Sequence, residues 1–183
     1  MTVEQAVKGK DLIVLSIPTH AVLDLPQNLF RDVPASVPVI DTNNYYPRER
    51  DGRIDPIEGG KTESRWTADT IGHSVVKAFN NIYSARLADD GKPKGAPDRI
   101  ALPVSGDDST HKATVIALLD ALGFDAVDNG PLDESWRHQP GSPGYVNNAD
   151  IAGVKAQLAA ASPERPEKFR GTPDSPGTWQ SPR

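Results

Sequence analysis

Side chains able to bind a ligand lie directly after the apolar runs of this chain. Thr19 and His20 follow one run, and Asn43 follows the next. Asn80 and Asn81 follow a third run. Amides and hydroxyls offer hydrogen-bond donors and acceptors without charge, which suits the binding of a carboxamide or a ribose. If the runs are parallel strands, their carboxyl ends meet at one edge of a sheet, where open α/β folds bind ligands.

Each of these polar residues also has a purely structural interpretation. Asx residues after strands commonly form turns or cap helices, and this alternative covers Asn43, Asn44, Asp107 and Asp108. His20 is equally consistent with an ordinary helix-start residue. Lys77 lies inside an apolar run, so it must either pair with a carboxylate or extend to the sheet edge, because burying an unpaired charge is costly.

Several kinds of chemistry are excluded or disfavoured by composition. The chain has no cysteine, which excludes disulfides, thiolate metal sites and thiol nucleophiles. Its four histidines show no short metal-ligand spacing, so no metal site is expected. The segment Gly59–Thr62 resembles the end of a P-loop but lacks the spacing of that motif and a preceding strand. No order of serine, histidine and aspartate suggests a hydrolase triad.

The charge balance bears on the partners that the chain can bind. Lys and Arg number 20 and Asp and Glu number 25, for a net charge of −5. Nucleic acids and anionic membranes both reward clustered positive charge, so neither is an expected partner. The apolar run 12–17 is too short for a membrane span, which needs about 20 residues. Without cysteine or a signal peptide, the chain fits a cytoplasmic protein that binds a small molecule.

The apolar runs predict strands that alternate with helices. Unbroken β-branched runs are typical of strands buried on both faces of a parallel sheet, and they occupy residues 12–17, 37–40, 75–79 and 100–104, with a last short strand at 124–127. Helices are predicted at 2–8, 109–122 and 150–161, and long loops at 42–60 and 89–98. This alternation indicates an α/β fold, doubly wound, with a mainly parallel sheet flanked by helices.

The chain divides into a domain and a tail. Residues 1–161 carry the predicted elements. Residues 162–183 are rich in proline, serine, glycine and charge and contain few apolar residues, which predicts a disordered tail.

Three segments together resemble the NADP-dependent deazaflavin (coenzyme F420) reductases and their relatives. They are VVKAFNNIYSARL at 75–87, LPVSGDD at 102–108 and LLDALGFDAVDNGPL at 118–132. DLIVLSIP at 11–18 is similar to the fourth-strand region of that family, and VIDTNNYYPRERDGRI at 39–54 resembles bacterial relatives. The resemblance spans about residues 2–146 and implies a partial Rossmann-like domain.

The resemblance also implies an activity and a site. The complete protein would transfer a hydride between NADP(H) and a flavin, a deazaflavin or another small acceptor. Pro18, Thr19 and His20 would lie near the ribose or nicotinamide, with Asn43 on the next segment. The nicotinamide pocket would be lined by Phe79, Asn80, Asn81 and Ile82. Direct hydride transfer between stacked rings needs positioning more than a proton-transferring residue, so no catalytic acid or base is expected.

One feature of the family is missing from this chain. Family members open with a strand and a G-x-G-x-x-G turn that places the pyrophosphate on a helix N-terminus, and this sequence contains no such motif. We therefore expect a fragment, a mis-called start or a truncated product that binds NADP(H) weakly. The alternative is a non-catalytic protein or an interaction subunit that pairs with another subunit through an exposed sheet edge. In both cases the strand at 12–17 would have an uncovered edge that invites self-association, so a homo-oligomer is expected.

Overall fold

Five short strands form the centre of the computed structural model, which describes residues 1–183. β1 (Ile13–Leu15), β2 (Val39–Asp41) and β3 (Val76–Lys77) are parallel and lie in the order β1-β2-β3. β4 (Ala101–Val104) and β5 (Asp125–Asp128) form a second parallel pair. An antiparallel bridge between Lys77 and Ser105 joins the end of β3 to the end of β4. The prediction of a mainly parallel, partial Rossmann-like α/β sheet is confirmed.

Helices and single helical turns connect the strands. The α-helices are α1 (Val3–Val7), α2 (Asp55–Glu58), α3 (Glu63–Ile71), α4 (Ser84–Asp89), α5 (Ser109–Ala121) and α6 (Ile151–Ala160). The 3₁₀ helices are η1 (Thr19–Asp24), η3 (Leu132–His138) and η4 (Glu167–Phe169), and η2 (Pro47–Asp51) is a π-helical turn. None of these helices is long and apolar enough to cross a bilayer.

The longest helix begins and ends where its sequence signals indicate. The Asp108 carboxylate caps α5 by accepting hydrogen bonds from the backbone N–H groups of Thr110 at 2.8 Å and His111 at 3.0 Å. Gly123 follows the helix with a φ of 93°, a conformation that favours glycine. The structural interpretation of Asp108 is therefore confirmed, and the predicted helix at 109–122 is correct to within a residue.

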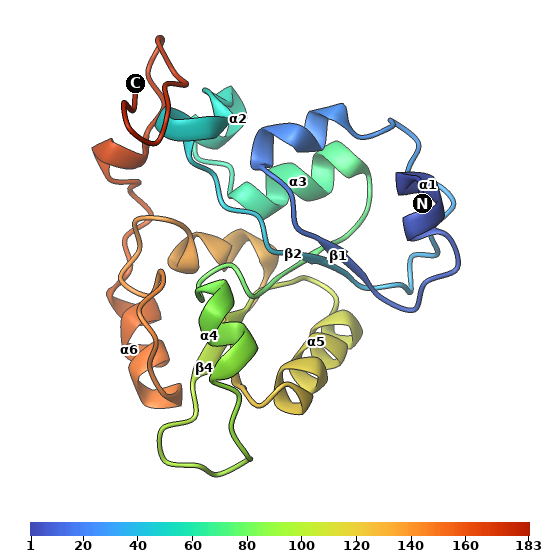
Figure 1. Ribbon diagram of the computed structural model, residues 1–183, viewed down its shortest axis with the longest axis vertical. Helices are drawn as coiled ribbons and strands as arrows, with labels where there is room; N and C mark the ends of the chain where they lie inside the picture. The colour runs from blue at the N-terminus through green and yellow to red at the C-terminus, as the bar shows by residue number, and fades with distance from the viewer.

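Helices α5 and α6 cover opposite faces of β4 (Figure 1). Successive side chains of a strand point to opposite faces. Accordingly, Leu102 packs in one core cluster with Leu119 of α5, and Ala101 packs in another with Leu158 of α6. This part of the sheet is thus buried on both faces, as its unbroken apolar run indicates.

The same prediction is wrong for β1. Ile13 and Leu15 are buried in the cluster that contains Trp66 of α3, but the Val14 side chain between them is 54% exposed. No helix covers that face of the strand at Val14, so an apolar residue there is accessible. An apolar run identifies the strand but does not show which layers are present on each side of it.

The prediction of one loop over residues 42–60 is also wrong in part. Within this stretch η2 forms a π-helical turn and α2 forms one α-helical turn, and both begin at or next to a proline. Proline is well suited to the first helical position, because its φ is already helical and its missing N–H is not needed there. Turns this short leave no apolar periodicity in the sequence, which is why they resemble a loop.

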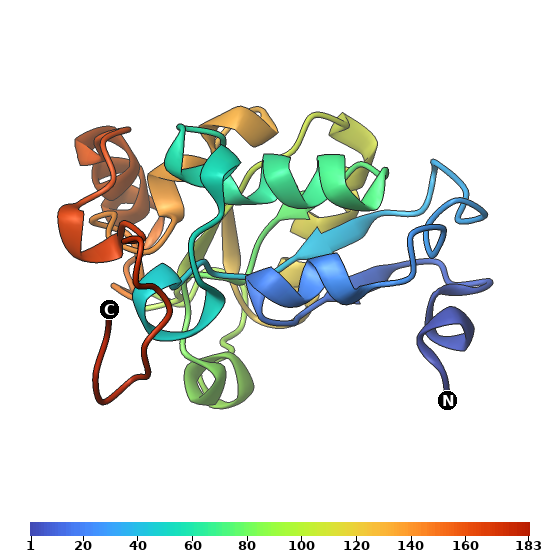
Figure 2. The ribbon, with the colours of Figure 1, turned by 90° about the horizontal axis from the view of Figure 1, so that it is seen from above.

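Residues 162–183 run along the domain toward η2 and α2. In Figure 1 this segment, drawn in red, extends from the end of α6 to the neighbourhood of α2. Arg48 of η2 donates to the Arg170 carbonyl at 2.8 Å, and its own carbonyl accepts from Gly177 N at 2.7 Å. The two ends of the chain lie on opposite sides of the molecule in both views (Figure 2). That these residues form a separate, disordered tail stays a prediction.

Candidate functional site

The segments that follow β1, β2 and β3 meet at one edge of the sheet. The backbone N–H of Ile17 donates to Asn43 Oδ1 at 2.9 Å, which joins the first segment to the second. Asn44 Nδ2 donates to the Asn80 carbonyl at 2.9 Å, which joins the second segment to the third. The parallel strand order therefore brings together the segments that carry Thr19, Asn43 and Asn80.

His20 lies at the outer side of this edge and pairs with a carboxylate from η2. His20 Nδ1 is 2.9 Å from Asp51 Oδ1, and Arg50 Nη2 is 2.9 Å from Asp51 Oδ2. Burial acts to raise the pKa of Asp51, but hydrogen bonds from Arg50, the Tyr46 N–H and His20 together lower it. His20 thus fastens the start of η1 to η2, which is a structural role in addition to its predicted place near a cofactor.

A group of charges lies at the strand ends, and Lys77, Asp41 and Glu63 among them are fully buried. Lys77 Nζ is 3.8 Å from Asp41 Oδ2 and 4.0 Å from Glu63 Oε2. Ser64 Oγ donates to Asp41 Oδ2 at 2.6 Å, and Arg165 Nη2 donates to Glu63 Oε1 at 2.7 Å. Buried charges are tolerated when they are paired and hydrogen-bonded. Two cations here balance two carboxylates, so of the two alternatives for Lys77, pairing with carboxylates is correct.

The Asn80 side chain belongs to a buried chain of hydrogen bonds. Its Nδ2 donates to the His138 carbonyl at 2.7 Å and to Asn44 Oδ1 at 3.2 Å. Its Oδ1 is 3.0 Å from His138 Nδ1, and His138 Nε2 is 3.0 Å from Ser105 Oγ. Asn129 Nδ2 donates to the same Ser105 oxygen at 2.9 Å.

The protonation of His138 fixes the direction of these bonds. Burial, and to a smaller extent the nearby Lys77 charge, lowers the pKa of His138 to about 3, so the imidazole is neutral near pH 7. Asn80 Oδ1 can only accept, so Nδ1 carries the ring proton and Nε2 accepts from the Ser105 hydroxyl. Because Ser105 and His138 are both fully buried, this pair is not placed to attack a substrate. It holds Asn80 in one orientation.

Backbone strain is concentrated beside Asn80 and Asn81. Only two non-glycine residues have positive φ: Phe79 at 63° and Val146 at 49°. Phe79 directly precedes Asn80, and the Val146 N–H donates to the Asn81 carbonyl at 3.1 Å. Positive φ is a true outlier for bulky or β-branched residues, and such residues cluster at functional sites.

Three of the predicted site residues have a buried polar atom without a hydrogen-bond partner. These atoms are Thr19 Oγ1, Asn43 Nδ2 and Asn81 Oδ1. An unpaired buried donor or acceptor costs about 1–3 kcal/mol, so such groups call for a partner such as a ligand or a bound water. One hydroxyl and two amides match the hydrogen-bonding groups of a ribose and a carboxamide. The residues present therefore fit a nicotinamide dinucleotide at this edge.

The apolar site residues have different surroundings. Ile82 is buried in the core cluster that contains Ile40 and Val76. Phe79 packs against the same cluster and is half-buried, and Pro18 is half-buried at the start of η1. Phe79 and Pro18 are thus the more accessible apolar surfaces at the edge.

Several residues of the site escape sequence reasoning. His138 and Glu63 come from η3 and α3, which were not predicted as elements, and Arg165 comes from the predicted tail. Thr62 is the one residue whose type could have indicated the start of α3. Its side chain caps the helix by accepting from the Arg65 N–H at 3.2 Å. Nothing in the spacing of these residues shows that they meet.

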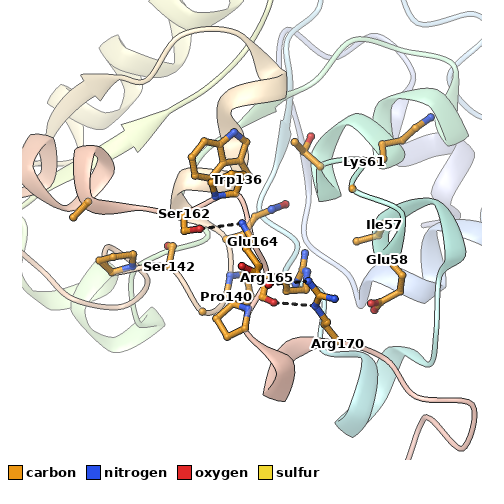
Figure 3. Close-up of a pocket in the computed structure, with 18 residues that line it drawn as sticks. Ile57, Glu58, Lys61, Trp136, Pro140, Ser142, Ser162, Glu164, Arg165 and Arg170 are labelled. Carbon is orange, nitrogen blue, oxygen red and sulfur yellow. Dashed lines mark hydrogen bonds and ion pairs between the residues drawn. The ribbon is translucent and has the colours of Figure 1, made fainter.

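A separate cavity of about 330 Å³ lies between α2, the end of η3 and the C-terminal segment (Figure 3). Its walls include Lys61, Trp136, Gln139, Ser142 and Arg165. None of the eight sequence-predicted site residues lines it. The predicted site and this cavity are therefore two distinct features.

Comparison with known proteins finds partial likenesses. No family model matches the chain. The Escherichia coli (strain K12) protein YjhV is 40% identical over 60 residues, which are 33% of this chain and 44% of that protein. The matched segment thus spans less than half the length of this curated relative.

The solved structures show which fold the chain shares. The hypothetical protein SMa0349 from Sinorhizobium meliloti has a TM-score of 0.65 at 28% identity, covering 80% of this chain and 69% of that chain. A protein from Arthrobacter sp. FB24 described as an F420-dependent NADP reductase has a TM-score of 0.54 at 22% identity, over 72% of this chain and 60% of that one.

A third structure extends the likeness to a further oxidoreductase. Glycerol-3-phosphate dehydrogenase from Saccharomyces cerevisiae has a TM-score of 0.50 at 14% identity, over 73% of this chain and 36% of that chain. At this level of identity the likeness shows a common fold. The chain therefore has a Rossmann-like fold that occurs in dinucleotide-dependent oxidoreductases.

Proposed function

We propose that this chain forms the nicotinamide side of an NADP(H)-dependent oxidoreductase, which transfers a hydride to or from a flavin-like or deazaflavin-like acceptor. One observation carries the proposal: strained backbone and unpartnered buried polar atoms coincide where the three parallel strands end. The Rossmann-like fold is consistent with it, because ligands of such folds bind at that edge.

The polar residues of the edge would hold the dinucleotide. Thr19, Asn43 and Asn81 supply the hydroxyl and amide groups that lack protein partners, and Pro18 and Phe79 supply apolar surface. When bound, the nicotinamide ring supplies the hydride or accepts it. The Ser105–His138 pair is buried and His20 is bound to Asp51, so the roles that these residues show are structural, and the proposed reaction depends on positioning.

Asn80 would act as a positioning residue. Its side-chain amide already donates two hydrogen bonds, to Asn44 Oδ1 and the His138 carbonyl, and accepts one, from His138 Nδ1. It therefore orients Asn44 and the Phe79–Asn81 backbone instead of offering a free group. In this role Asn80 would not contact the nicotinamide itself. An Asn80→Asp substitution would disturb the site through the neighbouring residues that Asn80 orients.

Access to Asn81 requires movement of residues 144–146. Asn81 Nδ2 donates to the Gly144 carbonyl at 3.5 Å, the long limit of a hydrogen bond. Val146 is held at positive φ, which costs about 1–3 kcal/mol. The Val146 N–H also holds this segment, by donating to the Asn81 carbonyl at 3.1 Å, so a ligand that displaces the segment breaks that bond while it relieves the strain.

The test is a titration of the ¹⁵N-labelled chain with NADPH, followed by amide chemical shifts. We expect saturable shifts at Thr19, Asn43 and Asn81, including the side-chain amides of the two asparagines. Asn81→Ala should weaken binding by about tenfold, which corresponds to one lost hydrogen bond to a polar ligand. NMR detects even millimolar binding, so the test does not depend on high affinity.

Asn148→Ala is the matched control. Asn148 is another asparagine with a buried, unpartnered side-chain oxygen, and it lies outside the converged strand ends. It should bind NADPH like the parent chain. Absence of shifts up to about 10 mM NADPH, or shifts confined to other surfaces, would contradict the proposal and favour a non-catalytic interaction protein.

A further inference from the structure

The cavity between α2, η3 and the C-terminal segment contains hydrogen-bond donors that the protein does not use. Arg165 Nη2 is occupied by Glu63, but Arg165 Nη1 is buried without a partner. Ser142 Oγ is also buried without a partner. Gln139 Oε1 accepts from the Glu63 N–H at 2.8 Å, and its Nε2 has no protein acceptor in range. A guanidinium, a hydroxyl and an amide among the residues that line the cavity thus have donors without protein acceptors.

Such a donor set selects an acceptor-only group. A carboxylate accepts several hydrogen bonds and pairs especially well with a guanidinium. Arg165 is held in place from behind, because its guanidinium also lies 5.3 Å from the ring centroid of Tyr45. A site whose donor is already oriented loses little conformational entropy on binding.

The carboxylates around the cavity disfavour a doubly charged anion. Lys61, Arg165 and Arg170 line the cavity together with Glu58 and Glu164, but Arg165 is already paired with Glu63 and Lys61 with Asp69. Glu58 is fixed within the wall, since its Oε1 accepts from Tyr45 Oη at 3.0 Å and from Gly171 N at 2.7 Å. A dianion such as phosphate would be repelled by these carboxylates more strongly than a monocarboxylate would be.

The remaining walls are flat and apolar. Trp136 lies at one side, and the Arg137 guanidinium stacks 4.2 Å from its ring centroid, which steadies the indole. Further apolar surface comes from Ile57, Pro140, Pro143, Pro163 and Pro166. Indole and proline rings pack well against a planar ring.

We propose that this cavity binds a small aromatic monocarboxylate, with the carboxylate on Arg165 Nη1, Ser142 Oγ and Gln139 Nε2 and the ring against Trp136. The site is distinct from the strand ends that would hold the dinucleotide. It does not depend on the proposed function, because a different set of residues forms it.

Benzoate is the probe, and the indole N–H resonance of Trp136 is the readout. The full chain has three tryptophans, and loss of one indole signal in Trp136→Phe assigns the resonance. We expect a saturable shift with a Kd of about 1 mM or tighter. Benzyl alcohol, which keeps the ring without the charge, should bind at least about tenfold more weakly.

Two variants separate ligand binding from folding. Arg165→Lys keeps a cation beside Glu63 but loses the second guanidinium nitrogen, and it should weaken benzoate by about tenfold. Ser142→Ala removes a hydroxyl that has no partner, so the fold should be unaffected while benzoate binding weakens by about threefold. Arg86→Lys is the control, because Arg86 is an exposed residue of α4 paired with Asp90.

Three results would overturn the proposal. The first is the absence of a saturable shift up to about 10 mM benzoate. The second is unchanged affinity in both Arg165→Lys and Ser142→Ala. The third is an equal response to inorganic phosphate, which would identify a general anion site instead of an aromatic carboxylate site.

Discussion

At the scale of single residues, His138 governs how a buried polar network responds to pH. In the unfolded chain its pKa returns to the ordinary value of 6.5, whereas in the folded chain it is about 3. Between these two values the unfolded state binds one more proton than the folded state. The contribution of His138 to stability is therefore full above about pH 6.5 and is lost as the pH falls toward 3.

The prediction is a slope of about 1.4 kcal/mol per pH unit in the free energy of unfolding between about pH 6 and pH 4. His138→Gln keeps a donor and an acceptor but cannot be protonated, so its slope should be smaller by that amount. Urea unfolding at several pH values gives the free energy of unfolding of both proteins. The carboxylates contribute equally to the two slopes, so their contribution cancels in the difference. Equal slopes would mean that His138 is protonated in the fold or exposed to water.

The sequence located the members of this network that directly follow strands, but not the histidine at its centre. Asn80 and Asn129 follow apolar runs, so their place at strand ends could be predicted. His138 could not, because its partners are Ser105 and Asn80, which lie 33 and 58 positions away. A lone histidine in a polar segment has no local pattern, and only the packing of η3 against the strand ends defines its role.

At the scale of elements, the end of β3 is a strained turn. Phe79 has a φ of 63°, where any residue with a Cβ meets its own carbonyl. Its side chain packs against the core cluster of α5 and β4, and this packing offsets the strain. The strain orients the amides that follow, as expected for a site in which positioning matters.

We predict that Phe79→Gly is more stable than Phe79→Ala by about 1 kcal/mol, although both lose the same ring. Glycine adopts positive φ without cost and alanine does not. Leu87, in the middle of α4, is the control position, where Ala should be more stable than Gly by about the same amount. Thermal or urea unfolding of the four variants gives both differences. A more stable alanine at both positions would show that Phe79 does not hold positive φ.

The elements predicted from the sequence were those with a strong local pattern. The apolar runs located all five strands, and the capping residue Asp108 with Gly123 delimited α5. Helix α3 was missed because its buried face includes Glu63, Ser64 and Thr67 alongside Trp66. Polar residues on a buried helical face weaken the periodicity that identifies a helix.

At the scale of the whole molecule, the C-terminal segment contributes to the charge balance of the core. Arg165 lies 13% exposed with its Nη2 on Glu63, which is itself only 1% exposed. Without Arg165, Glu63 would share Lys77 with Asp41. Beyond Arg165, the Trp179 ring packs edge-on against Tyr46 with centroids 5.0 Å apart. Composition predicts a disordered tail. These contacts allow that prediction to be tested, because removing them should lower stability only if the segment is docked.

Two truncations divide the segment at Arg165. Deleting residues 167–183 removes the Trp179 contact and the backbone bonds to Arg48 but keeps the ion pair. Deleting residues 162–183 also removes Arg165, and breaking a buried pair by losing one partner costs roughly 3–5 kcal/mol. We expect the longer deletion to unfold at a clearly lower urea concentration than the shorter one. The loss of stability should lie near the low end of that range, because Lys77 remains close to Glu63.

Full-length Arg165→Ala is the matched control and should reproduce most of the difference between the two truncations. If both truncations unfold at the same urea concentration as the full chain, residues 162–183 are a dispensable tail and Glu63 is satisfied without them. If only the longer deletion is destabilised, the domain extends through Arg165. In that case a boundary drawn from composition alone ends too early, because one arginine in a proline-rich segment neutralises a carboxylate in the core.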